Sequence, residues 1–490
     1  MAMALPKTIT ATARAIAAGE LTSRTATEAA LGRVERDNAS LGALLHVDAQ
    51  GALARADQID SQRRAGQPLG RLGGVPITLK DNISLVGMPM TAGSRILAGY
   101  RPPFDATVAA RVSAAGAIVI GKCNLDEFAM GSSNETSAFG PVRNPHDLDR
   151  VPGGSSGGSA VAVAAGFGFG SLGSDTGGSI RLPAALCGVV GLKPTYGRVS
   201  RYGVVAFASS LDQVGPLATT SRDAARLLGV IAGPCRHDST CADHSVPDFE
   251  AALGRESLAG IRVGVAREHL DGADGLDSAM SRRVRERLER LRDLGADLVD
   301  VELPHSHASI AAYYLIATAE ASANLARYDG VRFGHRSAAH GGDLEQLIAR
   351  SRGEGFGREV KRRIMLGTYA LSSGYYDAYY RKACQVRRLV HDDFVAAFSH
   401  CDLLAGPVSP VTAWRLAEKT GDPLAMYLMD VFTTAVNLAG LPALSMPMPV
   451  SAGEMPAGLH LIGRAFDETT LLGVADCLER SDREPGEATP

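Results

Sequence analysis

Apolar positions recur every three to four residues through residues 7–65, which predicts helices over this N-terminal segment. Thr22 or Ser23 can cap the second of these helices. The apolar run at residues 75–80 is strand-like and ends on a lysine, and residues 107–122 predict a helix, a glycine stop and a buried strand. This alternation of strands and helices favours an α/β fold with parallel strands.

The same alternation returns after residues 233–258, a polar and irregular segment that we expect to form a surface excursion. Residues 277–295 predict an amphipathic helix, and residues 310–400 are mostly helical in pattern. The strands expected in this half of the chain lie at residues 261–265, 298–303, 402–407, 443–447 and 459–463. We expect the tail, residues 481–490, to be disordered.

Residues 131–179 do not follow either pattern. They are rich in Gly, Ser and Asn, yet they carry little charge. A solvated linker would carry more charge and proline. We therefore expect a set of backbone turns that is packed in the interior, around a site.

Composition narrows the class of protein. The chain has 490 residues, of which 45% are hydrophobic and 21% charged, the balance of a soluble globular protein. Its formal net charge of −3 gives no global basic field for non-specific nucleic-acid binding. Seven cysteines without a Cys-x-x-Cys motif indicate reduced thiols in a cytoplasmic protein. The first residues lack the apolar stretch of a signal peptide, and we expect no membrane span.

Three patterns point to other functions, and each lacks part of what that function needs. Residues 116–123 match a phosphate loop except that the last residue is Cys123. Residues 168–173 fit the dinucleotide fingerprint by letters alone, without a clear strand before them. One group of possible metal ligands has none of the common zinc spacings: Cys235, His237, Cys241 and His244. We therefore expect neither a metal nor a nucleotide site in this chain.

Residues 153–157 satisfy the Gly-x-Ser-x-Gly elbow pattern with Ser155 in the nucleophile place, but no apolar strand precedes them. Ser155 is therefore predicted to take part in chemistry without being an elbow nucleophile. Ser179 lies in a second Gly-Ser stretch, and glycines beside both serines can expose N–H groups to an oxyanion. Lys80, at the end of an apolar strand, is normally a surface charge. If it is buried, its pKa falls and it can act as a neutral base.

The long run GGSSGGSAVAVAAG…GSDTGGSIRLPAALCGVVGLKPT (153–195) resembles the core motif of the amidase signature family. The resemblance implies a large mixed twisted sheet that is covered by helices on both faces and spans residues 66–480. Residues 1–65 would be a helical segment that packs on this core.

The same resemblance implies a role for each candidate residue. Ser179 would be the acylated nucleophile. Ser155, after a cis Gly154–Ser155 peptide, would relay its proton, and Lys80 would take the proton up. The oxyanion hole would be formed by the backbone N–H groups of the turn that ends at Ser179, namely those of Thr176, Gly177, Gly178 and Ser179.

Longer segments are similar to the A subunits of the glutamyl-tRNA(Gln)/aspartyl-tRNA(Asn) amidotransferases; they lie at residues 121–160, 196–217, 354–383 and 433–447. The similarity implies glutamine as the acyl donor and three glutamine contacts. Arg363 can fork the α-carboxylate, and Asp430 can pair with the α-ammonium. Tyr314 can hydrogen-bond near the amide or line the pocket. Arg362, beside Arg363 on the same basic helix, is the alternative carboxylate ligand.

The similarity also implies a heterotrimer. The ammonia would pass to a B-type subunit that binds misacylated tRNA and uses ATP and Mg²⁺, while a small C-type subunit braces the pair; this chain would hold no cofactor.

Two other hypotheses stay open. A free-standing amidase acting on another amide would share Lys80, Ser155 and Ser179 without needing Arg363 and Asp430, and a non-catalytic scaffold would need none of them.

Overall fold

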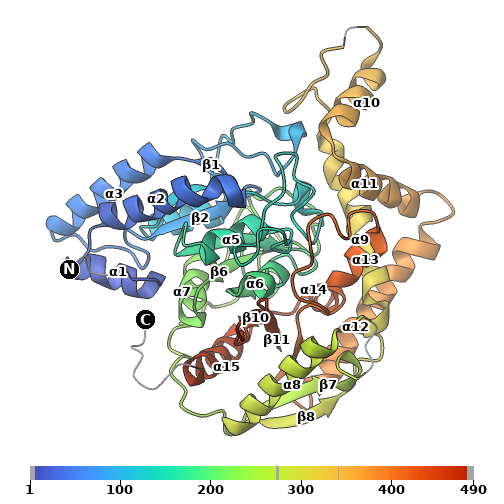
Figure 1. Ribbon diagram of the computed structural model, residues 1–490. Helices are drawn as coiled ribbons and strands as arrows, with labels where there is room; N and C mark the ends of the chain where they lie inside the picture. The colour runs from blue at the N-terminus through green and yellow to red at the C-terminus, as the bar shows by residue number, and fades with distance from the viewer. Residues whose placement is uncertain (1–5, 272–274, 340, 483–490) are drawn as a thin grey trace.

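The computed structural model describes residues 6–271, 275–339 and 341–482, and within them one 11-stranded sheet forms the centre of the molecule (Figure 1). The strands are β1 (Leu44–Val47), β2 (Pro76–Lys80), β3 (Ile118–Cys123), β4 (Gly170–Asp175), β5 (Val190–Lys193), β6 (Gln213–Ala218), β7 (Arg262–Ala266), β8 (Asp297–Val301), β9 (Leu403–Pro407), β10 (Ala443–Pro447) and β11 (Gly458–Gly463). Their order in the sheet is β1-β3-β2-β4-β6-β5-β10-β11-β9-β7-β8.

The sheet is mixed, as the sequence resemblance predicts. β2 runs parallel to β3 and β4, and β7 runs parallel to β8 and β9. Between these two parallel groups, β4, β6, β5, β10, β11 and β9 pair antiparallel in turn. The βαβ pattern expected around residues 107–122 is formed by β2, α4 and β3.

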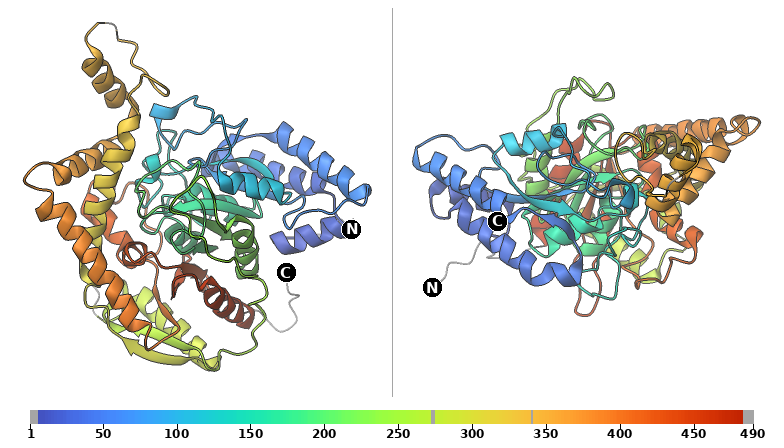
Figure 2. Two further views of the ribbon diagram at one scale, coloured as in Figure 1. Left: turned by 180° about the vertical axis from the view of Figure 1, so that it is seen from behind. Right: turned by 90° about the horizontal axis from the view of Figure 1, so that it is seen from above.

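Helices cover both faces of the sheet. They are α1 (Ile9–Ala18), α2 (Ser23–Leu41), α3 (Ala49–Arg64), α4 (Thr107–Ala114), α5 (Gly157–Ala164), α6 (Arg181–Cys187), α7 (Ser221–Ile231), α8 (Ser278–Asp293), α9 (Ser309–Asn324), α10 (Leu344–Gly355), α11 (Arg358–Leu371), α12 (Lys382–Ala397), α13 (Pro423–Tyr427), α14 (Thr434–Leu438) and α15 (Glu468–Ser481). One buried cluster joins the sheet to α4, α7, α8 and α15, and another joins it to α3, α5 and α6. A third cluster, around α9, α11 and α12, lies at the opposite end of the molecule from α1–α3 (Figure 2).

Alternation along β2 decides which face carries the site. Ile77 and Leu79 enter the buried cluster that α4 and α7 cover. Because successive side chains of a strand point to opposite faces, Thr78 and Lys80 point to the face that α5 covers. The last residue of β2 is therefore held under α5, next to the Gly-Ser stretch that begins this helix.

The sequence prediction was wrong at three places. Helices were expected throughout residues 7–65, but β1 interrupts them and pairs antiparallel with β3. Residues 131–179 are mostly buried, as expected, but they include α5 and β4 in addition to turns. Ser481 is the last residue of α15 and Asp482 pairs with Arg287 at 2.7 Å, so the start of the expected disordered tail is ordered. The rest of that tail, residues 483–490, lies outside the described residues.

The remaining expectations concern the surface. Thr22 is the residue that caps α2, since its hydroxyl accepts the Thr25 N–H at 3.0 Å. Residues 233–258 contain no regular helix or strand, and Phe249 anchors them in the core. Across the described ranges, no helix has the length and apolarity that crossing a membrane requires.

Candidate active site

Lys80 is fully buried at the end of β2, and its amino group lies among serine hydroxyls. The Nζ atom donates hydrogen bonds to the Oγ atoms of Ser155 and Ser156, both at 2.8 Å. It also donates to the Oγ atom of Ser174 at 3.0 Å and to the carbonyl of Ser174 at 3.2 Å. The lysine that the sequence predicts as a base is thus in direct contact with the predicted relay serine.

Burial changes the protonation of this lysine. Loss of solvent lowers the pKa of Lys80 to about 7, although Asp126, Asp175 and Asp212 act in the opposite direction. A lysine with this pKa is in large part neutral near pH 7, and a neutral amine can accept a proton. The surface-charge interpretation of Lys80 therefore does not apply.

Two Gly-Ser stretches meet at the lysine. The Gly154–Ser155 peptide is cis, as the family resemblance implies, and both Ser155 and Ser156 are fully buried. The Ser156 N–H donates to the backbone carbonyl of Ser179 at 3.1 Å, which joins the stretch before α5 to the turn before α6. Ser156 and Ser174 were not singled out from the sequence, although each adjoins a residue of a motif that was.

Ser179 occupies the turn between β4 and α6 and is 7% exposed. Its hydroxyl has no hydrogen-bond partner within the part of the chain that the structure describes, and the direct contact to Ser155 that a relay requires is not formed here. A nucleophile that is poised for a substrate needs an accessible hydroxyl, and Ser179 meets this condition while Ser155 and Ser156 are covered.

The turn before Ser179 is held by a buried ion pair. Asp175 accepts hydrogen bonds from the Gly178 N–H at 2.9 Å and the Ile180 N–H at 3.1 Å, and it pairs with Arg181 at 3.1 Å. Burial alone would raise the pKa of Asp175, but Arg181 more than offsets it, so that this pKa lies below its usual range. Asp175 is therefore charged and fixes the backbone of the turn.

The predicted oxyanion donors differ in whether they are already hydrogen-bonded. The Gly178 N–H points to Asp175 and is occupied, whereas the N–H groups of Gly177 and Ser179 have no acceptor among the described residues. Thr176 anchors the start of the turn through a hydroxyl hydrogen bond to Asp212 at 2.7 Å. The free N–H groups next to the Ser179 hydroxyl can donate hydrogen bonds to an oxyanion.

Two glycines of the turn cannot be replaced without a clash. A Cβ at Gly177 would lie 2.5 Å from the ring of Tyr313, and one at Gly178 would lie 2.3 Å from the Thr433 hydroxyl. Gly178 also has a φ of +143°, which favours glycine. Tyr313, rather than its neighbour Tyr314, is thus the tyrosine that covers the turn.

Arg363 and Tyr314 lie together beside the turn. The Arg363 guanidinium is buried and stands over the ring of Tyr314 at 5.2 Å and over that of Tyr427 at 5.3 Å. Its Nε donates to Glu359 at 2.8 Å, and the Tyr427 hydroxyl donates to the same carboxylate oxygen at 2.8 Å. Nη1 and Nη2 of Arg363 make no hydrogen bond within the described residues. These two nitrogens can therefore donate a pair of hydrogen bonds to a carboxylate.

Arg362 also pairs with Glu359, but its side chain is 30% exposed, against 3% for Arg363. Arg363 is the buried one of the two and stands over the Tyr314 ring, which favours Arg363 over Arg362 as a ligand. Glu359 and Tyr427 were missed in the sequence. Glu359 precedes Arg363 by one helical turn on α11, a spacing that could have indicated the pair.

Asp430 lies on the other side of the turn. Its Oδ2 atom accepts the Ser132 hydroxyl at 2.5 Å, and its Oδ1 atom is 3.2 Å from the Cβ position of Gly178. Burial raises the pKa of Asp430 to about 7, while Ser132 and Arg363 act to lower it. A cationic group that entered next to Asp430 would favour its charged form.

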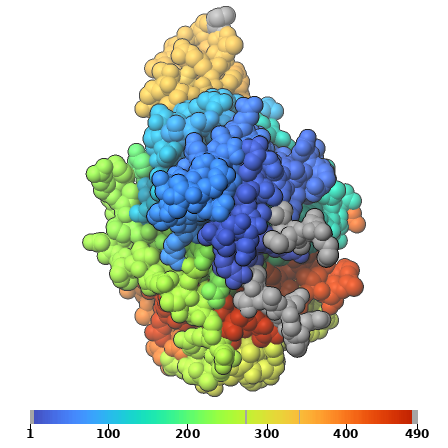
Figure 3. Space-filling view, turned by 90° about the vertical axis from the view of Figure 1, so that its left-hand side faces the viewer, coloured from blue at the N-terminus to red at the C-terminus, as the bar shows by residue number. Residues whose placement is uncertain are grey.

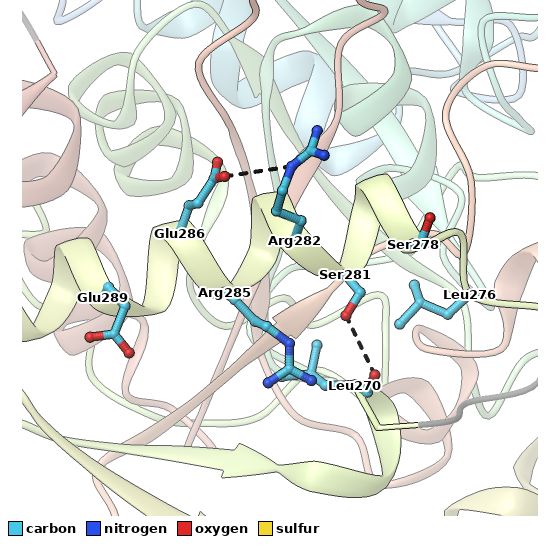
Figure 4. A pocket seen from close by; sticks show the side chains of 8 residues that line it. All are labelled: Leu270, Leu276, Ser278, Ser281, Arg282, Arg285, Glu286 and Glu289. Atoms are coloured by element: carbon cyan, nitrogen blue, oxygen red, sulfur yellow. Dashed lines mark hydrogen bonds and ion pairs between the residues drawn. The ribbon is translucent and has the colours of Figure 1, made fainter.

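A cavity of about 320 Å³ is lined by Arg363 together with Glu359, Tyr427 and Ser132, among others. A second hollow, of about 540 Å³, lies along α8 and contains none of the site residues (Figure 4). Arg282 and Glu286, one helical turn apart on α8, form an ion pair beside it at 3.6 Å. We assign substrate binding to the first cavity because, of these two, it is the one that a predicted ligand, Arg363, lines.

The possible metal ligands of residues 235–244 do not form a site in the described part of the chain, where no group of three or more His, Cys, Asp or Glu side chains could hold a metal ion. His244 stacks instead on Phe466, with ring centroids 4.4 Å apart. His237 stacks on Tyr202 at 4.7 Å.

Comparisons with known proteins place the chain in a family. A family model described as Amidase matches residues 25–472. The A subunit of the glutamyl-tRNA(Gln) amidotransferase of Oleidesulfovibrio alaskensis is 56% identical over 483 residues, which cover 98% of each chain. The protein of the same name from Nitratidesulfovibrio vulgaris is 57% identical over 470 residues, which cover 95% of each chain.

Solved structures show the same fold. The crystal structure of the A subunit of glutamyl-tRNA(Gln) amidotransferase from Thermotoga maritima matches with a TM-score of 0.78 at 43% identity, covering 94% of this chain and 91% of that one. The native peptide amidase from Stenotrophomonas maltophilia matches with a TM-score of 0.80 at 33% identity, covering 97% of this chain and 96% of that one. The chain therefore belongs to the amidase family, and within it to the group of glutamyl-tRNA(Gln) amidotransferase A subunits.

Proposed function

We propose that this chain is the glutamine-hydrolysing subunit of a tRNA-dependent amidotransferase. One observation carries the proposal: a buried lysine with a lowered pKa contacts Ser155 in a chain that shares more than half of its residues with A subunits of that name. The long identity outside the catalytic segment favours glutamine over other amides.

The proposed reaction begins with glutamine in the cavity beside Arg363. The two terminal nitrogens of Arg363 bind the α-carboxylate, and Asp430 pairs with the α-ammonium. Tyr314 lines this end of the pocket next to Arg363. The carboxamide then extends toward Ser179, since Asp430 adjoins the turn that carries this serine.

Proton transfer then follows the contacts of Lys80. Ser179 Oγ attacks the carboxamide carbon while its proton passes to Ser155, and the Ser155 proton passes to neutral Lys80. The N–H groups of Gly177 and Ser179 hold the oxyanion. Lys80 returns the proton through Ser155 to the leaving nitrogen, and the carbon–nitrogen bond breaks. Ammonia departs, and water hydrolyses the glutamyl ester on Ser179.

We further propose that the ammonia passes to a B-type subunit. That subunit would bind misacylated Glu-tRNA(Gln) or Asp-tRNA(Asn) and use ATP and Mg²⁺ to activate its carboxyl group, while a C-type subunit would brace the pair. The name of the relatives, which makes each of them one subunit of a glutamyl-tRNA(Gln) amidotransferase, supports a complex of this kind.

A free-standing amidase is the second candidate, since the peptide amidase of Stenotrophomonas maltophilia has the same fold. Its lower identity of 33%, against 56% for the amidotransferase relative, makes it the weaker one. An unrelated amide substrate would not need Arg363 and Asp430 as a clamp for an amino acid.

Ammonia release and Gln-tRNA(Gln) formation test the proposal. The wild-type chain and Ser179→Ala would be assayed with glutamine, alone and with co-expressed B and C subunits, ATP, Mg²⁺ and Glu-tRNA(Gln). We expect activity that needs Ser179 and rises with the complete mixture. Hydrolysis of simple amides that is indifferent to partners, with none of glutamine, would assign the chain to the second candidate.

A further inference from the structure

An exposed apolar surface lies at the end of α11 and on the chain that follows it. Seven of the exposed large hydrophobic side chains fall within residues 365–379: Met365, Leu366, Tyr369, Leu371, Tyr375, Tyr376 and Tyr379. Met365 is 72% exposed. The rings of Tyr369, Tyr375 and Tyr379 lie 4.5 to 5.9 Å apart, centroid to centroid, so that they form one surface. We call these seven residues the aromatic patch.

A basic groove adjoins the aromatic patch. Its volume is about 770 Å³, and Met365 and Leu366 are among the residues that line it. Its charged lining residues are Arg95, Glu354, Arg358, Lys361 and Arg362. The one acid, Glu354, is already bound by His335 at 2.7 Å and Ser337 at 2.7 Å. Arg95 and Arg358 have no ion-pair partner in the described parts of the chain. The groove therefore holds an excess of positive charge.

The groove leads to the candidate active site. Arg358 and Arg362 line both the groove and the cavity that contains Arg363. The helices α10 and α11 stand out from the body of the molecule (Figure 1), and α10 forms the projection at the top of Figure 3. A protein bound along α11 would thus sit at the mouth of the substrate cavity.

Monomeric soluble proteins rarely expose a contiguous apolar surface of this kind without a use for it. Tyr, Met and Arg are the residue types that are enriched at the centres of protein interfaces. A nucleic acid would use the basic groove but would gain little from Met365, Leu366 and Leu371. A second protein would use both halves, with acidic side chains against the groove and apolar side chains against the patch.

We propose that the aromatic patch and the basic groove form the docking surface for the ammonia-receiving partner subunit, which presents an acidic segment followed by apolar side chains. This inference rests on the proposed function, because that function supplies the need for a partner at the cavity mouth. The inference adds to the proposed function by assigning the contact with the partner to one face of α11.

The test measures assembly of the full chain with B and C subunits from the same source, by sedimentation and by titration of labelled chain. The variants are Met365→Asp and Tyr369→Asp in the patch and Lys361→Glu in the groove. Val86→Asp is the apolar control, since Val86 is 53% exposed, and Arg14→Glu on α1 is the charge control. Thermal unfolding and hydrolysis of a simple amide confirm that each variant is folded.

We expect each patch or groove variant to weaken assembly at least tenfold and the controls to leave it unchanged. The effect of Lys361→Glu should shrink at high salt, because screening weakens exposed charge pairs. Variants that assemble like the wild type would overturn the proposal. So would a wild-type chain that self-associates through this face, or variants that lose affinity for tRNA alone.

The same experiment separates this inference from the proposed function. Normal Gln-tRNA(Gln) formation by patch variants would remove the docking surface and leave the function standing. If assembly depends on the patch but the wild-type complex forms no Gln-tRNA(Gln), the docking surface stands and the proposed function falls. A wild-type chain that binds neither partner would overturn both.

Discussion

At the scale of single residues, the site depends on a lysine whose pKa is lowered by burial. Lys80 is surrounded by Ser155, Ser156 and Ser174, and none of these carries a charge that could hold the ammonium form. The three aspartates that favour the ammonium act through space and do not restore the ordinary pKa. The pKa near 7 places the change of charge within the pH range in which the enzyme would work.

The pH dependence of glutamine hydrolysis follows from this pKa. Below about pH 7 Lys80 is protonated and cannot accept the Ser155 proton, so that kcat/KM should fall by at least about tenfold per pH unit on the acid side. Asp430, with a pKa of about 7, loses its charge over the same range. An amide without an ammonium group separates the two, because its acid limb reports Lys80 alone. A profile that stays flat down to pH 5 would contradict the base role.

Gly177 gives a second prediction at this scale. Gly177→Ala would place a methyl group 2.5 Å from the Tyr313 ring and displace the oxyanion turn. We expect kcat to fall by roughly 10²-fold, the order of loss when an oxyanion donor is misplaced. Gly66→Ala is a matched control in open space, although its own φ of +70° calls for a check of stability. An unchanged kcat would remove Gly177 from the oxyanion hole.

The sequence predicts the candidate reacting residues more readily than it predicts their surroundings. Lys80, Ser155 and Ser179 stand in recognisable motifs. Ser156 could not be told from any other serine of a Gly-Ser stretch until the chain folded over Lys80. Likewise, the Gly178 N–H donates to Asp175 because of the direction in which the backbone turns there. A pattern of residue types does not reveal that direction.

At the scale of elements, α11 and α13 are joined through one carboxylate. Glu359 on α11 binds Arg363 of its own helix and the Tyr427 hydroxyl at the end of α13. Tyr427 in turn stacks on Tyr314 of α9, with centroids 3.9 Å apart. The guanidinium that would receive the substrate is thus positioned by three helices that are distant in sequence.

Glu359→Gln should therefore weaken substrate binding rather than chemistry. The charged hydrogen bond to Arg363 is lost, and such bonds contribute about 1.5–3 kcal/mol, which corresponds to a rise in KM of roughly 10- to 100-fold. We expect kcat to change far less. Steady-state kinetics with glutamine measure both, and Glu289→Gln, which changes an exposed glutamate on α8, is the control.

An amide that lacks the α-carboxylate distinguishes positioning from general damage. Its KM should be the same for the wild type and for Glu359→Gln, because Arg363 has nothing to bind. A parallel loss with both substrates would mean that Glu359 supports the fold and not the arginine.

Element prediction succeeded where the pattern was long and periodic, as in α8, whose Met280, Val284 and Leu288 are buried as expected. It failed for β1, a strand of four residues between two helices. This strand forms because it pairs with the edge of β3, which lies about 70 residues later in the chain. The local pattern of residues 44–47 carries no information about a partner at that distance. The expected tail began too early for a similar reason, since Arg287 of α8 binds Asp482.

At the scale of the whole molecule, a buried network ties the catalytic turn to the C-terminal strands. Arg181 of α6 pairs with Asp175 and donates to His460 of β11 at 3.0 Å, and Asn437 of α14 donates to Asp175 at 2.9 Å. These contacts join segments more than 250 residues apart, as the 262-residue separation between Asp175 and Asn437 shows. The oxyanion turn therefore depends on the completed fold.

Asp175→Asn should accordingly lower both stability and activity. It leaves the Arg181 guanidinium buried without its counter-charge, which costs about 3–5 kcal/mol in comparable cases. The free energy of unfolding in urea measures this loss, with the exposed Asp37→Asn as the control. A variant as stable as the wild type would contradict the assigned role of the ion pair.

The central claim is that Ser179 carries the acyl group, and trapping of the intermediate tests it most directly. The complete complex would be quenched with acid during turnover of glutamine, and the peptides mapped by mass spectrometry. The account predicts one added glutamyl group on the peptide that contains Ser179, and none after Ser179→Ala. A glutamyl group on Ser155 or Ser156, or undiminished ammonia release by Ser179→Ala, would contradict it.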